Sequence, residues 1–422
     1  TQFEDEQLSL LVQEALGHNY NLQEAAARLE SASARAKIAG APLYPQLNTG
    51  FSSSRRKQNF IGFPIPGENG VASSTTNSFG VSLDLSWEVD LWGRLGAGKA
   101  AAVADRQAAI ADLNGARLSL AAQTAKAWFA AAEADRQVEL ARATVDNYET
   151  SLQQVRARYE RGLRPSLDLR LSLSSLATAE DLLEQRLQLL DGALRQLEIL
   201  LGRYPDASIT PAKDLPRVTN EVPAGLKADL VSRRPDLIAA ERRFAASYAR
   251  ISEARKALYP RISLTASGGT ASNELGDLLN GDFSVWNLFG NVVQPLFQGG
   301  RLRAGVSLAE SESQRALARY AQSVLLAFAE VESALSAEGF LSRRQDAIEA
   351  ATEEAVSARR LAEERYLSGL ADLITLLESQ RRAYDAESRL LTVRRLRLDA
   401  RIDLHLALGG GFPQTSAGAS SN

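Results

Sequence analysis

The strongest constraint in this sequence is a strand-like segment that runs directly into a very long helical segment. Residues 77–95 read NSFGVSLDLSWEVDLWGRL, and apolar residues alternate with small or polar ones over ten positions. This period of two is typical of a strand. The residues that follow read as helix to about residue 159, which is ~65 residues or roughly 100 Å at ~1.5 Å per residue. Helices of compact domains average about 11–12 residues, so an ordinary globular domain does not fit. The apolar positions of the strand are Phe79, Val81, Leu83, Leu85 and Trp87.

A strand with one apolar and one polar face has two interpretations. It can cover a soluble core, or it can face lipid on one side and a watery lumen on the other. No run of 18 uncharged apolar residues exists in the sequence, so no transmembrane helix is expected. A membrane role therefore depends on strands or on a lipid anchor.

The same arrangement occurs a second time, which indicates a tandem duplication. Residues 286–302 end in the same Gly-Arg-Leu as residues 93–95, at an offset of 207. The Arg-Tyr pairs at 158 and 365 and the Leu-Gly pairs at 201 and 408 keep that offset, whereas Tyr44 and Tyr259 are 215 apart. The helical hairpins thus have equal lengths, and the length difference falls in the strand hairpin, where loops tolerate insertions. We expect the two long helices to lie side by side at equal height.

These offsets predict a division of the chain. The first repeat covers residues 8–204, with strands at 46–55 and 76–88 (strand hairpin 46–88) and a helical hairpin at 95–201. A Pro-rich linker follows at 205–223. The second repeat covers 224–409, with a strand hairpin at 261–294 and a helical hairpin at 301–408, and residues 410–422 form a disordered tail. Asn21 is the expected N-cap of a helix near the start.

Four strands per chain cannot close a barrel by themselves, because transmembrane barrels begin at about eight strands. An open sheet edge in lipid leaves backbone groups unsatisfied at several kcal/mol each. If these are membrane strands, the chains must pool them, and a dimer would supply eight and a trimer twelve.

Composition excludes several function classes. The formal net charge of −3 and the pI of about 5.8 leave no basic footprint, so nucleic acid is not an expected partner. There is no Cys and no Met, so a disulfide framework and thiolate or thioether metal sites are excluded. His18 and His405 have no companion ligands at metal spacing and are interpreted as structural. No nucleophile–base set or phosphate loop is present, so neither an enzyme nor a cofactor is expected.

Several motifs occur in a fixed order, and mostly in duplicate. They are Tyr44-Pro45-Gln46-Leu47, Asp90-Leu91-Trp92-Gly93-Arg94-Leu95, Arg234-Pro235-Asp236-Leu237, Tyr259-Pro260, Gly299-Gly300-Arg301-Leu302, two Arg-Tyr-x-x-Gly-Leu turns and Leu408-Gly409-Gly410-Gly411-Phe412. With them the chain resembles the outer-membrane factor family of TolC-like outer-membrane efflux channels, and more closely the lipoprotein branch that works with resistance-nodulation-division pumps. That branch usually carries an acylated Cys at the mature N-terminus, and because this sequence contains no Cys, lipidation is left open.

The resemblance implies a mixed α and β membrane protein of the Gram-negative outer membrane with a large periplasmic part. Its homotrimer would join a twelve-stranded β-barrel in outer-membrane lipid to a long α-helical coiled-coil barrel. Its partners would be a periplasmic adaptor protein and an inner-membrane resistance-nodulation-division pump. The implied function is the exit duct of a tripartite efflux system that passively exports drugs or other toxic small molecules. Two alternatives remain open: the exit channel of a type I protein-secretion system, and a soluble coiled-coil scaffold.

The resemblance also assigns roles to individual residues. The two Arg-Tyr-x-x-Gly-Leu turns read simply as helix C-caps, and in the family such turns form the periplasmic tip that docks the adaptor. Ile374, Glu378 and Arg381 share a helix face, which could be only a solvated face with an intrahelical ion pair, whereas in the family matching positions line a pore gate. The resemblance implies that Thr375 and its first-repeat counterpart Asp168 belong to the same gate. The tip residues are Arg158, Tyr159, Gly162, Leu163, Arg365, Tyr366, Gly369 and Leu370.

Overall fold

The computed structural model describes residues 5–61, 71–216 and 233–410. It contains two compact units, one of residues 1–28, 110–238 and 321–422 and the other of residues 29–109 and 239–320. Most of the loop between the first two strands lies outside the described residues, as do residues 217–223 of the predicted linker, the first residues of the second repeat and the tail from residue 411, including Phe412. The division into two repeats stays a prediction.

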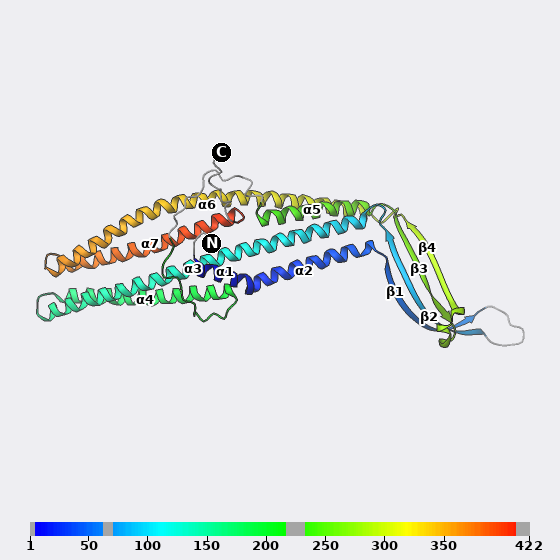
Figure 1. The fold of residues 1–422 in the computed structure, drawn as a ribbon, viewed down its shortest axis with the longest axis horizontal. Helices are drawn as coiled ribbons and strands as arrows, with labels where there is room; N and C mark the ends of the chain where they lie inside the picture. Colours follow the sequence, from blue (N-terminus) through cyan, green and yellow to red (C-terminus); the bar gives the residue numbers. More distant parts are fainter. Residues whose placement is uncertain (1–4, 62–70, 217–232, 411–422) are drawn as a thin grey trace, which may run out of the picture. The chain divides into compact units, whose positions relative to one another are not determined.

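The second unit holds a four-stranded antiparallel sheet in the order β1-β2-β3-β4 (Figure 1). Its strands are β1 (Gln46–Phe60), β2 (Ala72–Val89), β3 (Arg261–Ser272) and β4 (Ser284–Val293). All four predicted strands are confirmed. β1 and β2 run several residues further toward their connection than expected, because Ser, Thr, Asn and basic residues there give no apolar alternation to detect.

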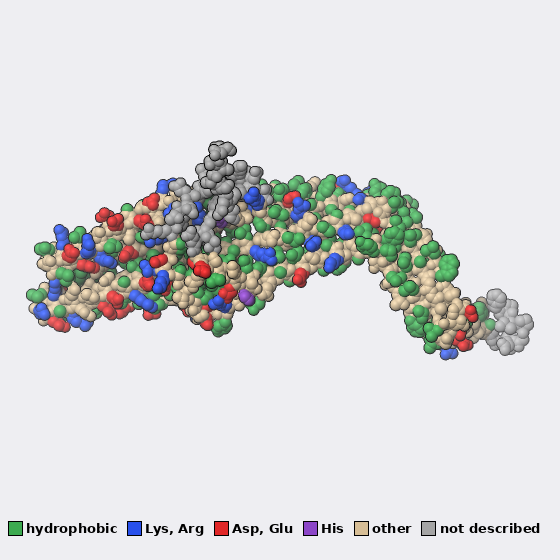
Figure 2. Space-filling view, in the orientation of Figure 1, with side chains coloured by type: hydrophobic (Ala, Val, Ile, Leu, Met, Phe, Trp, Pro, Cys, Tyr) green, Lys and Arg blue, Asp and Glu red, His purple; other side chains and the backbone are tan. Residues whose placement is uncertain are grey.

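The register places the large apolar side chains on one side of the sheet, called here the apolar face. Paired residues share a face, so Leu83 lies between Thr49 of β1 and Gly268 of β3, and Gly268 in turn pairs with Trp286. The opposite side is mostly polar, although Phe289 on β4 is an apolar exception. Hydrophobic side chains gather over the strands in Figure 2. The apolar face comprises Leu47, Phe51, Phe79, Val81, Leu83, Leu85, Trp87, Val89, Ile262, Leu264, Trp286, Leu288 and Val292.

Most of the rest of the described chain is helical. The two longest helices, α3 (Arg94–Glu160) and α6 (Arg301–Leu367), have 67 residues each, and each turns back into a shorter helix, α4 (Ser166–Leu201) or α7 (Leu373–Ala407). The equal lengths agree with the constant offset of 207 in the sequence. The remaining helices are α1 (Glu6–His18), α2 (Tyr20–Gly40) and α5 (Pro235–Lys256), with short 3-10 turns at Ala41–Leu43, Leu275–Leu279 and Gly281–Phe283.

Asp90 joins the second strand to the first long helix. Its carboxylate accepts hydrogen bonds from the backbone N–H groups of Leu95 (3.0 Å) and Gly96 (2.7 Å). These are among the first N–H groups of α3, which have no partner within the helix. The guanidinium of Arg94 also pairs with Glu88 at 2.8 Å. The Asp-x-x-Gly-Arg-Leu sequence therefore encodes a strand-to-helix junction.

The core of the first unit is built around Trp128 and Phe129, both fully buried. The indole N–H of Trp128 donates to Asp5 at 2.8 Å, which ties α1 to α3. The expected cap at Asn21 is wrong: α2 begins at Tyr20, and the Asn19 side chain accepts from the N–H of Leu22 and donates to the carbonyl of Leu200. Sequence reasoning chose the wrong Asn because both precede apolar residues. Within the described ranges, no helix combines the length and apolar character needed to cross a bilayer.

Candidate functional site

The two predicted tip turns have the same backbone. At the end of α3, Gly162 has φ of 71°, its N–H donates to the carbonyl of Tyr159, and the N–H of Leu163 donates to that of Arg158. At the end of α6, Gly369 has φ of 74° and the same two bonds recur, from Gly369 to Tyr366 and from Leu370 to Arg365. This pair of bonds defines the Schellman motif. The C-cap interpretation of both glycines is confirmed.

The two turns differ in their side-chain surroundings. Tyr366 is fully buried, whereas Tyr159 is 40% exposed. The guanidinium carbons of Arg158 and Arg164 lie 5.1 and 5.3 Å from the centre of the Tyr366 ring. Arg158 also donates to the carbonyls of Tyr366 (3.3 Å) and Leu367 (3.1 Å). One predicted tip residue, Arg158, thus caps the last turn of α6 and holds another, Tyr366, in a cationic environment.

Apolar side chains project from both turns into solvent. Leu163 is 68% exposed and Leu370 is 78% exposed. Leu167 in the first turn of α4, Leu367 at the end of α6 and Ile374 in the first turn of α7 are also more than half exposed. Exposed apolar side chains clustered in this way are typical of a protein–protein contact surface.

The predicted gate residues carry a chain of ion pairs along α7. The Arg381 guanidinium binds Glu378 through two hydrogen bonds of 3.0 and 2.9 Å and reaches Asp385 at 3.1 Å. Arg382 donates to Glu378 at 2.7 Å. The hydrogen bonds from Arg382 and Arg381 hold the pKa of the Glu378 carboxyl below its usual value. The same carboxylate holds the pKa of the Arg381 guanidinium above its usual value. Both partners of this pair lie on one helix, as the solvated-face interpretation expects.

The other predicted gate positions lie within one turn of a helix start. Ile374 is 64% exposed. The backbone N–H of Thr375 donates to Asp372, the N-cap of α7, at 2.7 Å. Hydrogen bonding by Thr375, first through its side chain and then through its backbone N–H, lowers the pKa of the Asp372 carboxyl. Asp168 pairs with Arg164 at 3.7 Å in the first repeat. Asp168 and Thr375, although at matching sequence positions, therefore have different roles at their helix starts.

Sequence reasoning missed four residues around these positions: Arg164, Asp372, Arg382 and Asp385. Arg382 and Asp385 could have been found, because Glu378 and Arg382 are four residues apart on a helix, as are Arg381 and Asp385. Arg164 and Asp372 flank the turns, and only their packing against Tyr366 and Thr375 shows their role.

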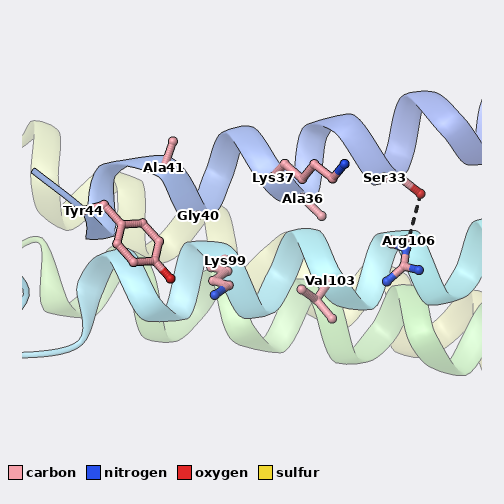
Figure 3. A pocket seen from close by; sticks show the side chains of 9 residues that line it. All are labelled: Ser33, Ala36, Lys37, Gly40, Ala41, Tyr44, Lys99, Val103 and Arg106. Atoms are coloured by element: carbon pink, nitrogen blue, oxygen red, sulfur yellow. Dashed lines mark hydrogen bonds between the residues drawn. The ribbon is translucent and has the colours of Figure 1, made fainter. Parts of the chain in front are cut away.

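A pocket between α2 and α3 in the second unit was also missed (Figure 3). Its volume is about 660 Å³, and its lining combines small apolar residues with Lys37, Lys99, Arg106 and Tyr44. Arg106 donates to Ser33 at 3.2 Å. No carboxylate is among the lining residues, so the pocket is positively charged. It lies near the start of β1, and none of the predicted tip or gate residues lines it.

No group of three or more His, Asp or Glu side chains is arranged to hold a metal ion in the part of the chain that the structure describes. Burial lowers the pKa of His405 to about 4. The ring Nδ1–H of His18 donates one hydrogen bond to the carbonyl of Glu14 (3.1 Å). The absence of a metal site and of a cofactor stays a prediction.

Comparisons with known proteins agree on one family. The family model described as outer membrane efflux protein matches residues 11–203 and 227–410. The pyoverdine export outer membrane protein OpmQ of Pseudomonas putida is 33% identical over 98% of this chain and 88% of its own length. Outer membrane protein OprJ of Pseudomonas aeruginosa is 33% identical over 97% of this chain and 85% of its own length. The crystal structure of the Campylobacter jejuni CmeC outer membrane channel superposes with a TM-score of 0.92, at 25% identity, over 98% of this chain and 88% of that chain.

Proposed function

The chain belongs to the outer membrane efflux protein family, and on this premise we propose that three copies of it form the outer-membrane exit duct of a tripartite efflux system. In this duct the sheets of three chains close a twelve-stranded β-barrel, and their helices form the periplasmic tube. OpmQ is named for pyoverdine export, and we extend export of small molecules to this chain.

The observation that carries the proposal is the exposed apolar face on a sheet with two open edges. Phe51, Leu83 and Leu288 of this face are 63%, 51% and 69% exposed. Exposure of such a face to water is unfavourable. In a bilayer the apolar face contacts hydrocarbon, while the polar face lines a lumen. The edge strands β1 and β4 need partners in lipid. Joining β1 of one chain to β4 of the next satisfies both edges.

The tip turns are the proposed docking surface for a periplasmic adaptor, which in turn connects to a resistance-nodulation-division pump. Leu163 and Leu370 support this role because they are the most exposed apolar side chains of the two turns. Leu163→Asp combined with Leu370→Asp should abolish crosslinking of the channel to its adaptor in cells. The trimer yield of the same variant, measured by native mass spectrometry, should be unchanged.

We further propose that Ile374, Glu378 and Arg381, with Asp168 and Thr375, contribute to a constriction near the tip. Each position occurs once per chain, so a trimer places three copies around the axis. An apolar ring resists wetting, and a charged ring selects by sign. Adaptor docking at the neighbouring turns would then widen the constriction. The transport is passive, and we propose no catalytic activity.

Two measurements test the duct. Native mass spectrometry of the detergent-solubilised protein should give three chains, and a stable monomer or dimer would contradict the twelve-stranded barrel.

Leu83→Arg on the apolar face should cost about 2–4 kcal/mol if it lies near the bilayer midplane. Ser82→Arg on the polar face is the matched control and should be much milder. Equal folding yields of the two variants in liposomes would show that the two faces of the sheet are assigned wrongly.

A further inference from the structure

The β1–β2 hairpin continues past the rest of the sheet (Figure 1). Pairing between β2 and β3 ends at Phe79 and Ser272, whereas β1 and β2 stay paired as far as Phe60 and Ala72. The protruding part of β1 carries three consecutive cations, Arg55, Arg56 and Lys57. β1 has no acidic residue, and the first in β2 is Asp84. The end of the hairpin away from the helices is therefore strongly positive.

The register separates these three cations between the two faces. Arg55 pairs with Asn77 and Lys57 with Thr75, in the same alternation as Phe51 with Val81, so both lie on the apolar face. Arg56 pairs with Thr76 and lies on the polar face. All three side chains are exposed.

None of the three cations makes an ion pair or a side-chain hydrogen bond with another residue in the described part of the chain. Among the described residues, the β3–β4 connection at that end of the sheet carries acidic side chains. Asp277 of that connection already accepts a hydrogen bond from Ser272 at 2.8 Å. The positive charges of the three cations are therefore not neutralised by any described residue, and they can bind an anionic ligand.

The depth of the two outward cations follows from strand geometry. The apolar face of β2 runs from Val89 to Phe79, which is about 25 Å of membrane height at ~3.4 Å per residue and a tilt of about 45°. This matches the apolar band of about 25 Å in outer-membrane barrels. Arg55 lies opposite Asn77, roughly 5 Å beyond that band, and Lys57 roughly 10 Å beyond it. Both therefore lie at the level of lipid headgroups.

We propose that Arg55 and Lys57 bind the phosphate groups of the phosphorylated glycolipid that forms the outer leaflet of the outer membrane. Arg binds phosphate through its planar fork and Lys as a point charge. The hydroxyl of Thr75 and the amide of Asn77 lie beside them on the same face and can donate to further phosphate or sugar oxygens. This inference rests on the proposed function, which places the helices in the periplasm and hence the hairpin end at the outer surface.

The test is a titration of the delipidated full-length trimer in detergent with purified lipopolysaccharide. Arg55→Gln and Lys57→Gln should each weaken binding about fivefold, and the double variant about 25-fold, which is the effect of about 1 kcal/mol per surface cation. Arg56→Gln removes the same charge one residue away on the opposite face, and it should change binding less than twofold. Dephosphorylated lipopolysaccharide should bind wild type as weakly as the phosphorylated form binds the double variant.

Other outcomes would overturn the inference. An effect of Arg56→Gln equal to that of Arg55→Gln would mean that net charge matters and the lipid face does not. Unchanged binding by the double variant, or equal affinity for dephosphorylated lipopolysaccharide, would remove the phosphate contact. Binding of inorganic phosphate alone at the same residues would point to a free anion in place of a lipid. Native mass spectrometry of each variant checks the trimer separately, so loss of the barrel is distinguishable from loss of the lipid site.

Discussion

The two turns that end the long helices share one backbone and differ in what surrounds them. Gly162 and Gly369 have φ values within 3° of each other and make the same hydrogen bonds. Yet Tyr366 is buried under Arg158 and Arg164, while its counterpart Tyr159 is exposed. Local sequence therefore determines the turn, whereas long-range packing determines its surface.

The difference follows from chain geometry. Arg158, at the first turn, contacts the second turn of the same chain. Arg365 is the counterpart of Arg158 at the offset of 207. Within one chain there is no third turn of this kind for Arg365 to contact. In a closed ring of repeats that position would be occupied by the first turn of the neighbouring chain. Tyr159 would then be covered in the trimer by the neighbour's Arg365, as Tyr366 is covered by Arg158.

The largest effect expected from this comparison is on stability. Tyr366→Ala should destabilise the protein by about 3–5 kcal/mol, because it empties a fully buried site. Tyr159→Ala should cost about 1 kcal/mol or less in a dissociated chain, because Tyr159 is exposed. Thermal unfolding of the two variants measures the difference. Equal large losses in the trimer would show that a neighbouring chain buries Tyr159.

Tyr366→Phe is the control for this pair. The buried hydroxyl of Tyr366 has no hydrogen-bond partner within the described residues, so removing it should leave stability unchanged or slightly raised. A loss comparable to that of Tyr366→Ala would mean that the hydroxyl, and not the ring under the two arginines, is what the site requires.

The second-largest effect is a loss of stability that should be the same at both turns. Gly162→Ala and Gly369→Ala each place a side chain at positive φ, which costs about 1–2 kcal/mol. A Cβ added at either glycine would meet no atom within 4 Å, so the cost comes from the backbone alone. Chemical unfolding should give two similar values. A difference above about 1 kcal/mol would break the equivalence of the two turns.

The third-largest effect tests directly whether the repeats of three chains form a closed ring. Arg158→Gln removes two hydrogen bonds to carbonyls and a ring contact and should cost about 1 kcal/mol. Arg365→Gln should cost as much only when the trimer is intact. The sequence has no Cys, so Tyr159→Cys with Arg365→Cys gives an unambiguous readout. A flexible bis-maleimide, which spans more than the short Cα–Cα separation of a disulfide, should link chains into dimers and trimers on a denaturing gel, and monomers alone would argue against the repeating ring.

How much the sequence could predict depended on the type of signal. Strand alternation and the turn glycines Gly162 and Gly369 are local patterns, and the sheet and both turns were predicted from them. The equal lengths of the two long helices were predicted from the constant offset between the repeats. The ends of β1 and β2 at residues 56–60 and 72–75 were missed because the residues there show no apolar alternation. The burial of Tyr366 and the capping by Arg158 join residues more than 200 positions apart, and no single-sequence pattern encodes such a contact.

The smallest effect on stability separates the helices that follow the turns. On α7 the exposed positions carry Glu378, Arg381 and Asp385, whereas the matching positions of α4 are Leu171, Ser174 and Thr178. Glu378→Ala with Arg381→Ala removes one charge of each sign, and because these side chains are solvated, thermal stability should not change measurably. If these charges help hold a closed constriction, single-channel conductance in planar bilayers should rise while trimer yield stays constant.

The pH dependence of conductance sharpens this last prediction. Because Arg382 and Arg381 lower the pKa of Glu378 from its usual 4.5, the carboxylate stays charged as pH falls to that value and loses its ion pairs only below it. Conductance of the wild type should therefore be constant between pH 7 and pH 5 and rise only at lower pH, and the double variant should lack that rise.

If the double variant conducts like wild type, Ile374→Gly tests whether the apolar side chain forms the constriction instead. An increase with Ile374→Gly would assign the constriction to the apolar ring, and wild-type conductance in both the double variant and Ile374→Gly would mean that the constriction lies elsewhere along the duct.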